Sequence, residues 1–282
     1  MQPQTRMVLA YDNLLRGSLV PTITLTGCTA AAGSSVDNLK VEDPSLPLVT
    51  TVPTANPVIK VEWTSILPTG AILVGFINQN FWLTYTTLTV ETSADGATGW
   101  GEIGRLELDL EPARTTSIGG TRALLLRCNG TSTFRFWRFT FIKASAWPSI
   151  TIGNIVLMRY YEVAKNPTRD LFRHRLVREQ EVQRAIGGAL HVTRGPARIY
   201  HGAEYTFTRI DEPQAQRLVE IAAVHGDRIV GVISAEQAAH IIPTGLGHLF
   251  CRIPEIPIYQ PSPGVSDTTH KVNLTLRCDA GW

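Results

Sequence analysis

The spacing of apolar residues in the first 160 positions constrains the fold most, because these residues recur at every second position in short stretches separated by turn residues. Residues 58–63 alternate in the manner of a half-buried strand, and residues 71–77 form the continuous apolar run of a buried sandwich strand. After the strand predicted at 88–92, Asp95-Gly96 supplies the positive φ that a hairpin turn requires. Helical periodicity is nearly absent, so this half predicts an antiparallel β-sandwich.

Three further strands are predicted at residues 123–128, 134–142 and 150–160. In the second of them aromatic side chains fall on both faces, which predicts packing in the core, with Arg135 and Arg138 at the rim or in an interface. Stacking of this Arg-aromatic run on sugars or on single-stranded bases is the alternative.

The charge balance argues against a dedicated nucleic-acid binder, because the formal net charge is only +2. Of the 26 basic residues, 21 are arginines, which indicates either a role in interfaces or a genome that favours arginine codons. The N-terminal residues lack the pattern of a secretory signal. The most apolar window, residues 70–90, is interrupted by Asn78, Gln79 and Asn80, so we expect no membrane span.

The character of the sequence changes between residues 162 and 184, where charged residues are interspersed and apolar ones are sparse. We expect a linker or exposed arm here, with a short helix over residues 178–186. The arm is predicted to contact a neighbouring chain through its arginines, Arg169, Arg173, Arg175, Arg178 and Arg184.

The last part of the chain predicts a smaller domain that is either α+β or a β-barrel with one packed helix. A strand at 198–210 precedes a helix capped by Asp211 and ended by Gly226. The apolar side of this helix is expected to consist of Leu218, Ile221, Ala222 and Val224. Strands at 228–234, 249–253 and 270–278 complete the domain. The predicted mainly β chain is thus divided into a sandwich (1–162), an Arg-rich linker or arm (163–187) and an α+β domain (188–282).

Motifs of catalysis and of metal binding are missing from the sequence. It has neither GxSxG nor HExxH, and its cysteines show no CxxC pair that would suit zinc: Cys28, Cys128, Cys251 and Cys278. We expect reduced, packed thiols. Glu107, Asp109 and Glu111 project from one strand face, as solvated residues do, although a glycosidase pair or a hard-cation site would also use carboxylates. The sequence therefore predicts no enzyme, no cofactor and no metal.

Three segments in order resemble the discoidin (coagulation-factor type C, galactose-binding-like) sandwich. They are LTVETSADGATGWGEI at 88–103, FRFWRFTFI at 134–142 and ITIGNIVL at 150–157. The YDNLL at 11–15 and the VDNL at 36–39 also resemble the start of this module in phage virion proteins. The resemblance covers about residues 8–160. It implies loops at one end of the sandwich that bind sugars, lipids or proteins, although many members are purely architectural.

Residues 187–282 more loosely resemble the ring-forming β domain of phage distal-tail and tail-hub proteins, through a strand, the helix EPQAQRLVEIAAVHG and the strand RIVGVIS. The order departs from that family, in which the ring domain comes first. The resemblance implies a non-enzymatic structural protein of a phage tail or tail tip, made in the host cytoplasm and located in the virion. Its partners would be further copies in a symmetric ring and the tube, hub and fibre proteins.

The alternative function is a carbohydrate-binding receptor module on the same virion, with a host surface glycan as partner. It requires an exposed aromatic platform, for which the candidates are Trp82, Trp100 and Trp147. Each of these tryptophans could instead pack in the core or within a loop.

Overall fold

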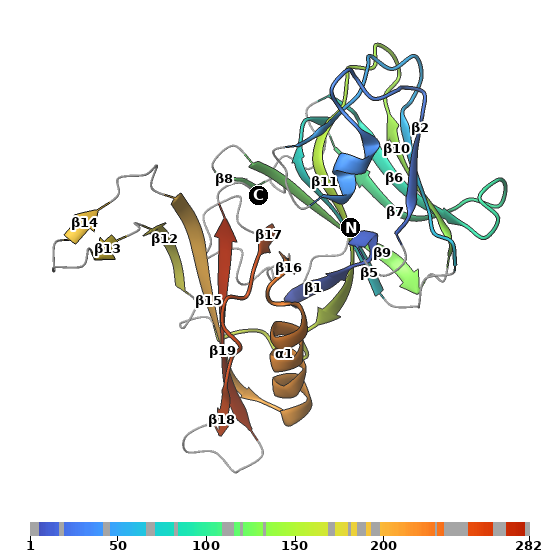
Figure 1. Cartoon of the computed structure of the whole chain (residues 1–282). Helices are drawn as coiled ribbons and strands as arrows, with labels where there is room; N and C mark the ends of the chain where they lie inside the picture. The colour runs from blue at the N-terminus through green and yellow to red at the C-terminus, as the bar shows by residue number, and fades with distance from the viewer. Residues whose placement is uncertain are drawn as a thin grey trace. The chain divides into compact units, whose positions relative to one another are not determined.

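The computed structural model (Figure 1) describes most of the chain. The described residues are 6–16, 20–41, 46–65, 71–81, 84–108, 116–118, 121–131, 134–168, 173–179, 182–184, 190–192, 198–228, 230–233, 248–261 and 269–279. Two compact units share the chain: unit 1 comprises Met1–Val163, Ile229–Phe250 and Gly281–Trp282, and unit 2 comprises Ala164–Arg228 and Cys251–Ala280. The predicted fold class, a mainly β chain with an N-terminal antiparallel sandwich, is confirmed.

One layer of the sandwich in unit 1 is a five-stranded antiparallel sheet. In spatial order its strands are β2 (Thr22–Thr26), β4 (Val58–Glu62), β10 (Phe136–Ile142), β6 (Thr87–Ser93) and β7 (Gly101–Glu107). Strands β4 and β10 alternate between buried and more exposed side chains, which explains why the period of two in the sequence is clear there.

The other layer is an eight-stranded sheet. Its path is β17 (His248–Cys251), β16 (Val230–Ile233), β1 (Val8–Asn13), β11 (Thr151–Glu162), β5 (Ala71–Gln79), β9 (Thr121–Thr131) and β8 (Thr116–Ile118), and β3 (Leu48–Val49) pairs with β11 beside it. Two short 3-10 helices lie at the motifs that resemble the start of the module: η1 (Leu14–Arg16) contains the last two residues of YDNLL, and η2 (Val36–Lys40) contains the whole of VDNL.

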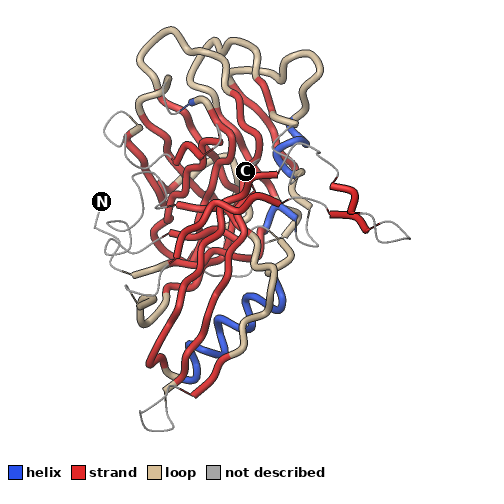
Figure 2. Tube along the Cα trace, turned by 90° about the vertical axis from the view of Figure 1, so that its left-hand side faces the viewer, coloured by secondary structure: helices blue, strands red, loops and turns tan. Residues whose placement is uncertain are grey.

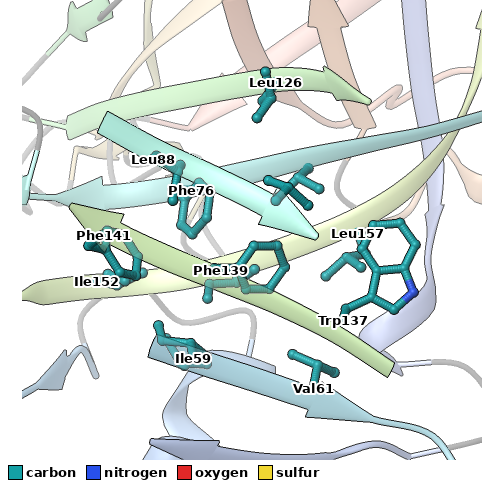
Figure 3. Packing of buried hydrophobic residues seen from close by; sticks show 14 of the residues in the cluster. Ile59, Val61, Phe76, Leu88, Leu126, Trp137, Phe139, Phe141, Ile152 and Leu157 are labelled. Carbon is teal, nitrogen blue, oxygen red and sulfur yellow. The ribbon is translucent and has the colours of Figure 1, made fainter. Parts of the chain in front are cut away.

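The sandwich core lies between the two sheets and is rich in aromatic rings (Figure 3). Phe76 on β5 meets Phe139 and Phe141 on β10 edge to face, with ring centroids 5.6 and 6.2 Å apart. Phe81 packs on the same group at 5.2 Å from Phe76. Each of these rings is fully buried, so the core joins strands that are far apart in sequence.

The eight-stranded sheet is buried on its second face as well. A separate cluster of fully buried residues lies there: Val8, Ala10, Leu73, Ile77, Val156 and Met158. Strand β5 therefore buries successive side chains on opposite faces, which accounts for the continuous apolar run from residue 71 to 77.

Strand β16 adds to the edge of the sandwich beside β1, where Val8 pairs with Ile233 and Ala10 with Gly231. From sequence this strand and the following one were predicted to lie in the domain at 188–282, whereas the structure places both in the sheet of unit 1. The sequence did not indicate that the chain returns to the first sheet after unit 2. A strand that pairs with β1 does so through backbone N–H and C=O groups, and no side-chain motif marks that pairing.

The described residues of unit 2 form a four-stranded antiparallel sheet and the helix α1 (Glu212–His225), which lies alongside the long strands (Figure 2). The sheet order is β12 (Arg173–Glu179), β15 (Arg198–Ile210), β19 (His270–Asp279) and β18 (Tyr259–Pro261), and β13 (Val182–Arg184) pairs separately with β14 (Leu190–Val192).

The ends of α1 follow the sequence prediction. Asp211 Oδ1 accepts a hydrogen bond from the backbone N–H of Gln214, and Gly226 is the C-cap. Three residues of the predicted apolar side, Leu218, Ile221 and Ala222, are buried. Val224 is 59% exposed, so its assignment to that side was wrong.

The segment expected to be a linker contains a strand of the sheet. β12 pairs with β15 along its whole length, from Arg173 opposite Glu204 to Glu179 opposite Arg198. The helix expected over 178–186 is therefore wrong where the structure describes it, because β12 and β13 occupy those positions. The run RHRLVRE has no helical stripe, and pairing with a long neighbour satisfies its backbone as a strand.

Cysteine chemistry differs from the expectation at Cys251. Cys28 and Cys128 are free thiols, as expected, but Cys251 at the end of β17 is disulfide-bonded. Widely spaced cysteines give no pairing information in a sequence, because a disulfide depends on distance in space.

Replacing Phe76 with alanine should lower the free energy of unfolding by about 3–5 kcal/mol, because the cavity would lie between both sheets. The matched control is Val52→Ala, at a side chain that is 73% exposed, for which we expect a change within about 0.5 kcal/mol. Urea unfolding followed by circular dichroism measures both. Equal losses for the two variants would contradict the described core.

Candidate functional site

The turn between β6 and β7, residues 93–100, is held by six side-chain hydrogen bonds within it; we name it the Trp100 turn. The carboxylate of Asp95 ties it together, since Oδ1 accepts from the N–H groups of Ala97 and Thr98, both at 2.9 Å, and Oδ2 accepts from Thr98 Oγ1 at 2.7 Å. Ser93 Oγ lies 2.9 Å from Asp95 Oδ1 and accepts from the N–H of Gly96 at 3.0 Å. The hairpin turn predicted at Asp95-Gly96 is confirmed.

These hydrogen bonds favour the ionised carboxylate. The hydroxyl and N–H of Thr98, followed by the N–H of Ala97 and the hydroxyl of Ser93, hold the pKa of Asp95 well below its usual range. The turn is therefore built around a permanent negative charge at neutral pH.

The turn folds back onto one face of the five-stranded sheet, which we call the outer face because it is turned away from the core. Gly96, with a φ of +73°, lies directly on the ring of Phe136, and a Cβ at this glycine would come within 2.5 Å of that ring. Lys60 Nζ donates to the carbonyl oxygen of Gly96 at 3.1 Å and lies 4.9 Å from the centre of the Phe136 ring. Phe136 is consequently buried although its strand position points outward.

Trp100 ends the turn and is partly exposed. The guanidinium of Arg138 lies over its indole at 4.4 Å from the ring centre. Arg138 is itself fixed by a bidentate pair, in which Nε and Nη2 donate to the two carboxylate oxygens of Glu91 at 2.7 and 2.6 Å. Register supports this arrangement, because Arg138 and Glu91 are directly opposed on β10 and β6. The indole is thus held before any ligand arrives.

The other two candidate tryptophans do not form this site. Trp147 follows β10 at the opposite end of the sandwich, where its Nε1 lies 2.7 Å from Asn56 Oδ1 and 3.0 Å from the carbonyl oxygen of Lys143. Its ring packs against the sandwich core, so it organises a loop. Trp82 lies outside the described residues.

The predicted arginine interface is only partly described. Arg173, Arg175 and Arg178 lie in β12 and Arg184 in β13, whereas Arg169 lies outside the described residues. Of the strand carboxylates, Glu107 ends β7 and accepts from Arg105 Nε at 2.6 Å and from Thr87 Oγ1 at 2.7 Å. These hydrogen bonds lower the pKa of Glu107. Asp109 and Glu111 lie outside the described residues.

The free thiols are packed groups. Complete burial raises the pKa of Cys128 to about 12, and burial also raises the pKa of Cys28. Tyr85, whose hydroxyl donates to the carbonyl oxygen of Pro148 at 2.7 Å, has its pKa raised to about 12, chiefly by burial and also by the charge of Cys28. Across the described residues no group of three His, Cys, Asp or Glu side chains is placed to hold a metal, and none of the described helices is long and apolar enough to cross a membrane.

Comparison with known proteins returns structures but no sequence relatives. No family model and no curated protein matches the chain. CpGH89CBM32-6 from Clostridium perfringens is 15% identical, with a TM-score of 0.38 over 52% of this chain and 99% of its own. Chitosan-binding module 1 from a chitosanase/glucanase of Paenibacillus sp. IK-5 is 15% identical, with a TM-score of 0.36 over 52% and 98%. The lectin-binding domain of Lectinolysin in complex with Lewis b is 13% identical, with a TM-score of 0.37 over 52% and 96%. At these scores the likenesses assign no ligand to this chain.

The residues that sequence analysis missed here are those that hold Trp100. The Ser-x-Asp-Gly pattern predicted the turn, but the roles of Arg138 and Glu91 depend on which residues of β10 and β6 are paired. The available signal was Arg138, a charged residue in the middle of an aromatic strand. From the sequence it could lie at the rim of the core, lie in an interface, or stack on a sugar or a base.

Gly96→Ala should destabilise the protein by about 1–3 kcal/mol, because alanine is strained at positive φ and its Cβ would meet Phe136. Gly101→Ala is the control, since nothing lies within 4 Å of its Cβ position and its φ is not positive. Urea unfolding followed by circular dichroism gives the stability of both variants. A Gly96 variant as stable as the Gly101 variant would show that the turn does not rest on the sheet.

The turn should remain ordered in acid below the ordinary range of aspartate. A carboxyl group with a lowered pKa in the folded state stabilises that state above its unfolded pKa of about 3.9, and this stabilisation disappears as pH falls through the folded pKa. The amide signal of Thr98, followed by NMR from pH 7 downward, should therefore shift only below about pH 3. In Asp95→Asn the signal should be displaced at pH 7 and show no such step. A midpoint near pH 4 in the wild type would contradict the hydrogen-bonded carboxylate.

Proposed function

We propose that this protein is a non-catalytic glycan-recognition protein and that its sandwich binds saccharide at the Trp100 turn. The observation that carries the proposal is a partly exposed indole at the end of a turn anchored on the sheet, with the guanidinium of Arg138 over the ring. It corresponds to the carbohydrate-binding function considered above as the alternative. Its support comes from the turn itself, because the compared structures all have TM-scores below 0.5.

The chemistry of the site suits a pyranose ring. An indole offers a large, rigid apolar surface on which the C–H face of a sugar can lie at little entropic cost. Arg138 and Glu91 next to it provide donors and acceptors for ring hydroxyls. Because the indole and its neighbours are already fixed, little of the binding free energy is spent on ordering them.

Assembly into the symmetric ring of a phage tail or tail tip is a second candidate function, and it has a separate observation in its favour. The segment leading into edge strand β18 exposes Ile256 and Ile258 by 58% and 78%, and clustered exposed apolar residues mark interaction surfaces. Arg-rich β12 is the other edge of that sheet. The virion location and the tube, hub and fibre partners belong to this candidate.

The mass of the purified full chain in solution tests the ring. A closed oligomer that dissociates in the Ile258→Asp variant would support it. A wild-type monomer at micromolar concentration would count against it.

Trp100→Ala should abolish glycan binding by the full chain while leaving the fold intact, because the indole is not among the core residues. Trp100→Phe should retain part of the affinity, since a smaller ring still stacks. Trp147→Phe is the control at the other end of the sandwich and should bind as the wild type does. A broad glycan array followed by calorimetry on the best ligand measures these effects. Wild-type silence across the array, or loss of binding only in the Trp147 variant, would refute the proposed site.

A further inference from the structure

The Trp100 turn contains the one Asp-Gly pair of the chain, Asp95-Gly96. Aspartate rearranges to isoaspartate most readily when glycine follows it, because glycine has no Cβ to shield its backbone nitrogen. Asp95 is exposed, so burial does not keep water or base away from this peptide bond. Protection of the pair therefore depends on the bonds that the turn makes.

The rearrangement begins when the backbone nitrogen of Gly96 attacks the carboxyl carbon of Asp95. The new N–C bond closes a five-membered succinimide, the nitrogen loses its proton to water, and the carboxyl hydroxyl leaves as water. A second water then opens the ring. When it opens the ring at the original main-chain carbonyl, Gly96 stays attached through the side chain of Asp95. The backbone is then longer by one methylene, and the mass of the chain is unchanged.

The carboxyl group of Asp95 is a poor electrophile in the folded turn. Cyclisation uses the protonated carboxyl, because a hydroxyl leaves more easily than an oxide. The hydroxyl of Thr98 donates to Oδ2 at 2.7 Å, and the N–H groups of Thr98 and Ala97 donate to Oδ1 at 2.9 Å. These bonds hold the pKa of Asp95 well below its usual range. At about pH 5 the protonated fraction is therefore smaller in the folded turn than in an unfolded chain, where the pKa of aspartate is about 3.9.

The attacking nitrogen is restrained as well. The N–H of Gly96 donates to the Oγ of Ser93 at 3.0 Å, and Ser93 is buried. The carbonyl oxygen of the same glycine accepts from Lys60 Nζ at 3.1 Å, and the residue lies directly on the ring of Phe136. Attack requires the peptide unit between Asp95 and Gly96 to turn toward the carboxyl carbon. These three contacts resist that rotation.

We propose that Asp95-Gly96 is a latent isoaspartate site, which is blocked while the Trp100 turn is closed and reacts when the turn opens. The added methylene moves the carboxylate away from the N–H groups of Ala97 and Thr98, so the turn does not close again in the same form. Isoaspartate at this position therefore accumulates in proportion to the time that the turn spends open. The inference involves no ligand and is independent of the proposed function.

The test is incubation of the full chain at about pH 5, folded and in denaturing urea, followed by peptide mapping that separates aspartyl from isoaspartyl forms. The mapping has to resolve individual peptides, because Asn129-Gly130 in β9 can give the same product. Isoaspartate at residue 95 should form at least about tenfold more slowly in the folded chain than in urea, since opening the turn breaks several hydrogen bonds. Equal rates in the two states, or no isoaspartate at residue 95 in urea, would overturn the inference.

A variant tests whether the bonds of the turn provide the protection. Thr98→Val removes the hydroxyl that donates to Asp95, keeps the N–H, and changes an exposed side chain. While folded, this variant should form isoaspartate at residue 95 about two- to tenfold faster than the wild type, the range expected for one hydrogen bond. In urea the two chains should react alike.

Thr24→Val is the matched control, since Thr24 is an exposed threonine in β2, outside the turn. It should react at the rate of the wild type in both states. A folded Thr98 variant that reacts no faster than the folded Thr24 variant would show that the hydrogen bonds of the turn do not protect the pair.

Discussion

Edge-to-face packing of Phe139 and Phe141 against Phe76 fixes the register of the central strand β10. Because side chains alternate along a strand, a shift of one residue would exchange the core face for the outer face. With the rings inside, Arg138 must point outward, opposite Glu91 on one side and Lys60 on the other. The core contact therefore determines which groups surround Trp100, although Trp100 is not itself one of the residues of the core cluster.

The second sheet places a different constraint on the molecule. Buried residues also lie on the face of this sheet that is turned away from the sandwich core. Strand β16 pairs with β1, with β17 beyond it, after the chain has passed through unit 2. A fragment that ended near Val163 would leave the edge of β1 unpaired. The N-terminal sandwich is therefore not a domain that can be produced alone by ending the chain near Val163. Binding experiments need the whole protein.

The sequence predicted those parts of the fold in which local pattern and tertiary environment agree. Alternation identified β4, an apolar run identified β5, and Asp95-Gly96 identified the turn. The same is true of α1, where Asp211 and Gly226 act as caps. At each of these places the local chemistry suffices to choose the conformation.

The remaining features depend on contacts between distant segments, which a single sequence does not encode. The RHRLVRE segment becomes β12 because β15 offers it a partner, and β16 joins the first unit because β1 has an open edge. At the site, the composition of the turn indicated a hairpin. The contact of Gly96 with Phe136 and the stacking of Arg138 on Trp100 form only when the strands are paired in the folded sheet. Trp147 and Trp100 looked alike in sequence, and only their surroundings distinguish them.

The most direct test of the account is an NMR titration of the full chain with an oligosaccharide that it binds, observing the indole N–H signals of tryptophan and the Nε–H signals of arginine. The account predicts that the largest changes occur at Trp100 and Arg138, at the start of β10. Changes confined to Trp147 and the loops beyond the other end of β10, with the Trp100 and Arg138 signals unmoved, would contradict it.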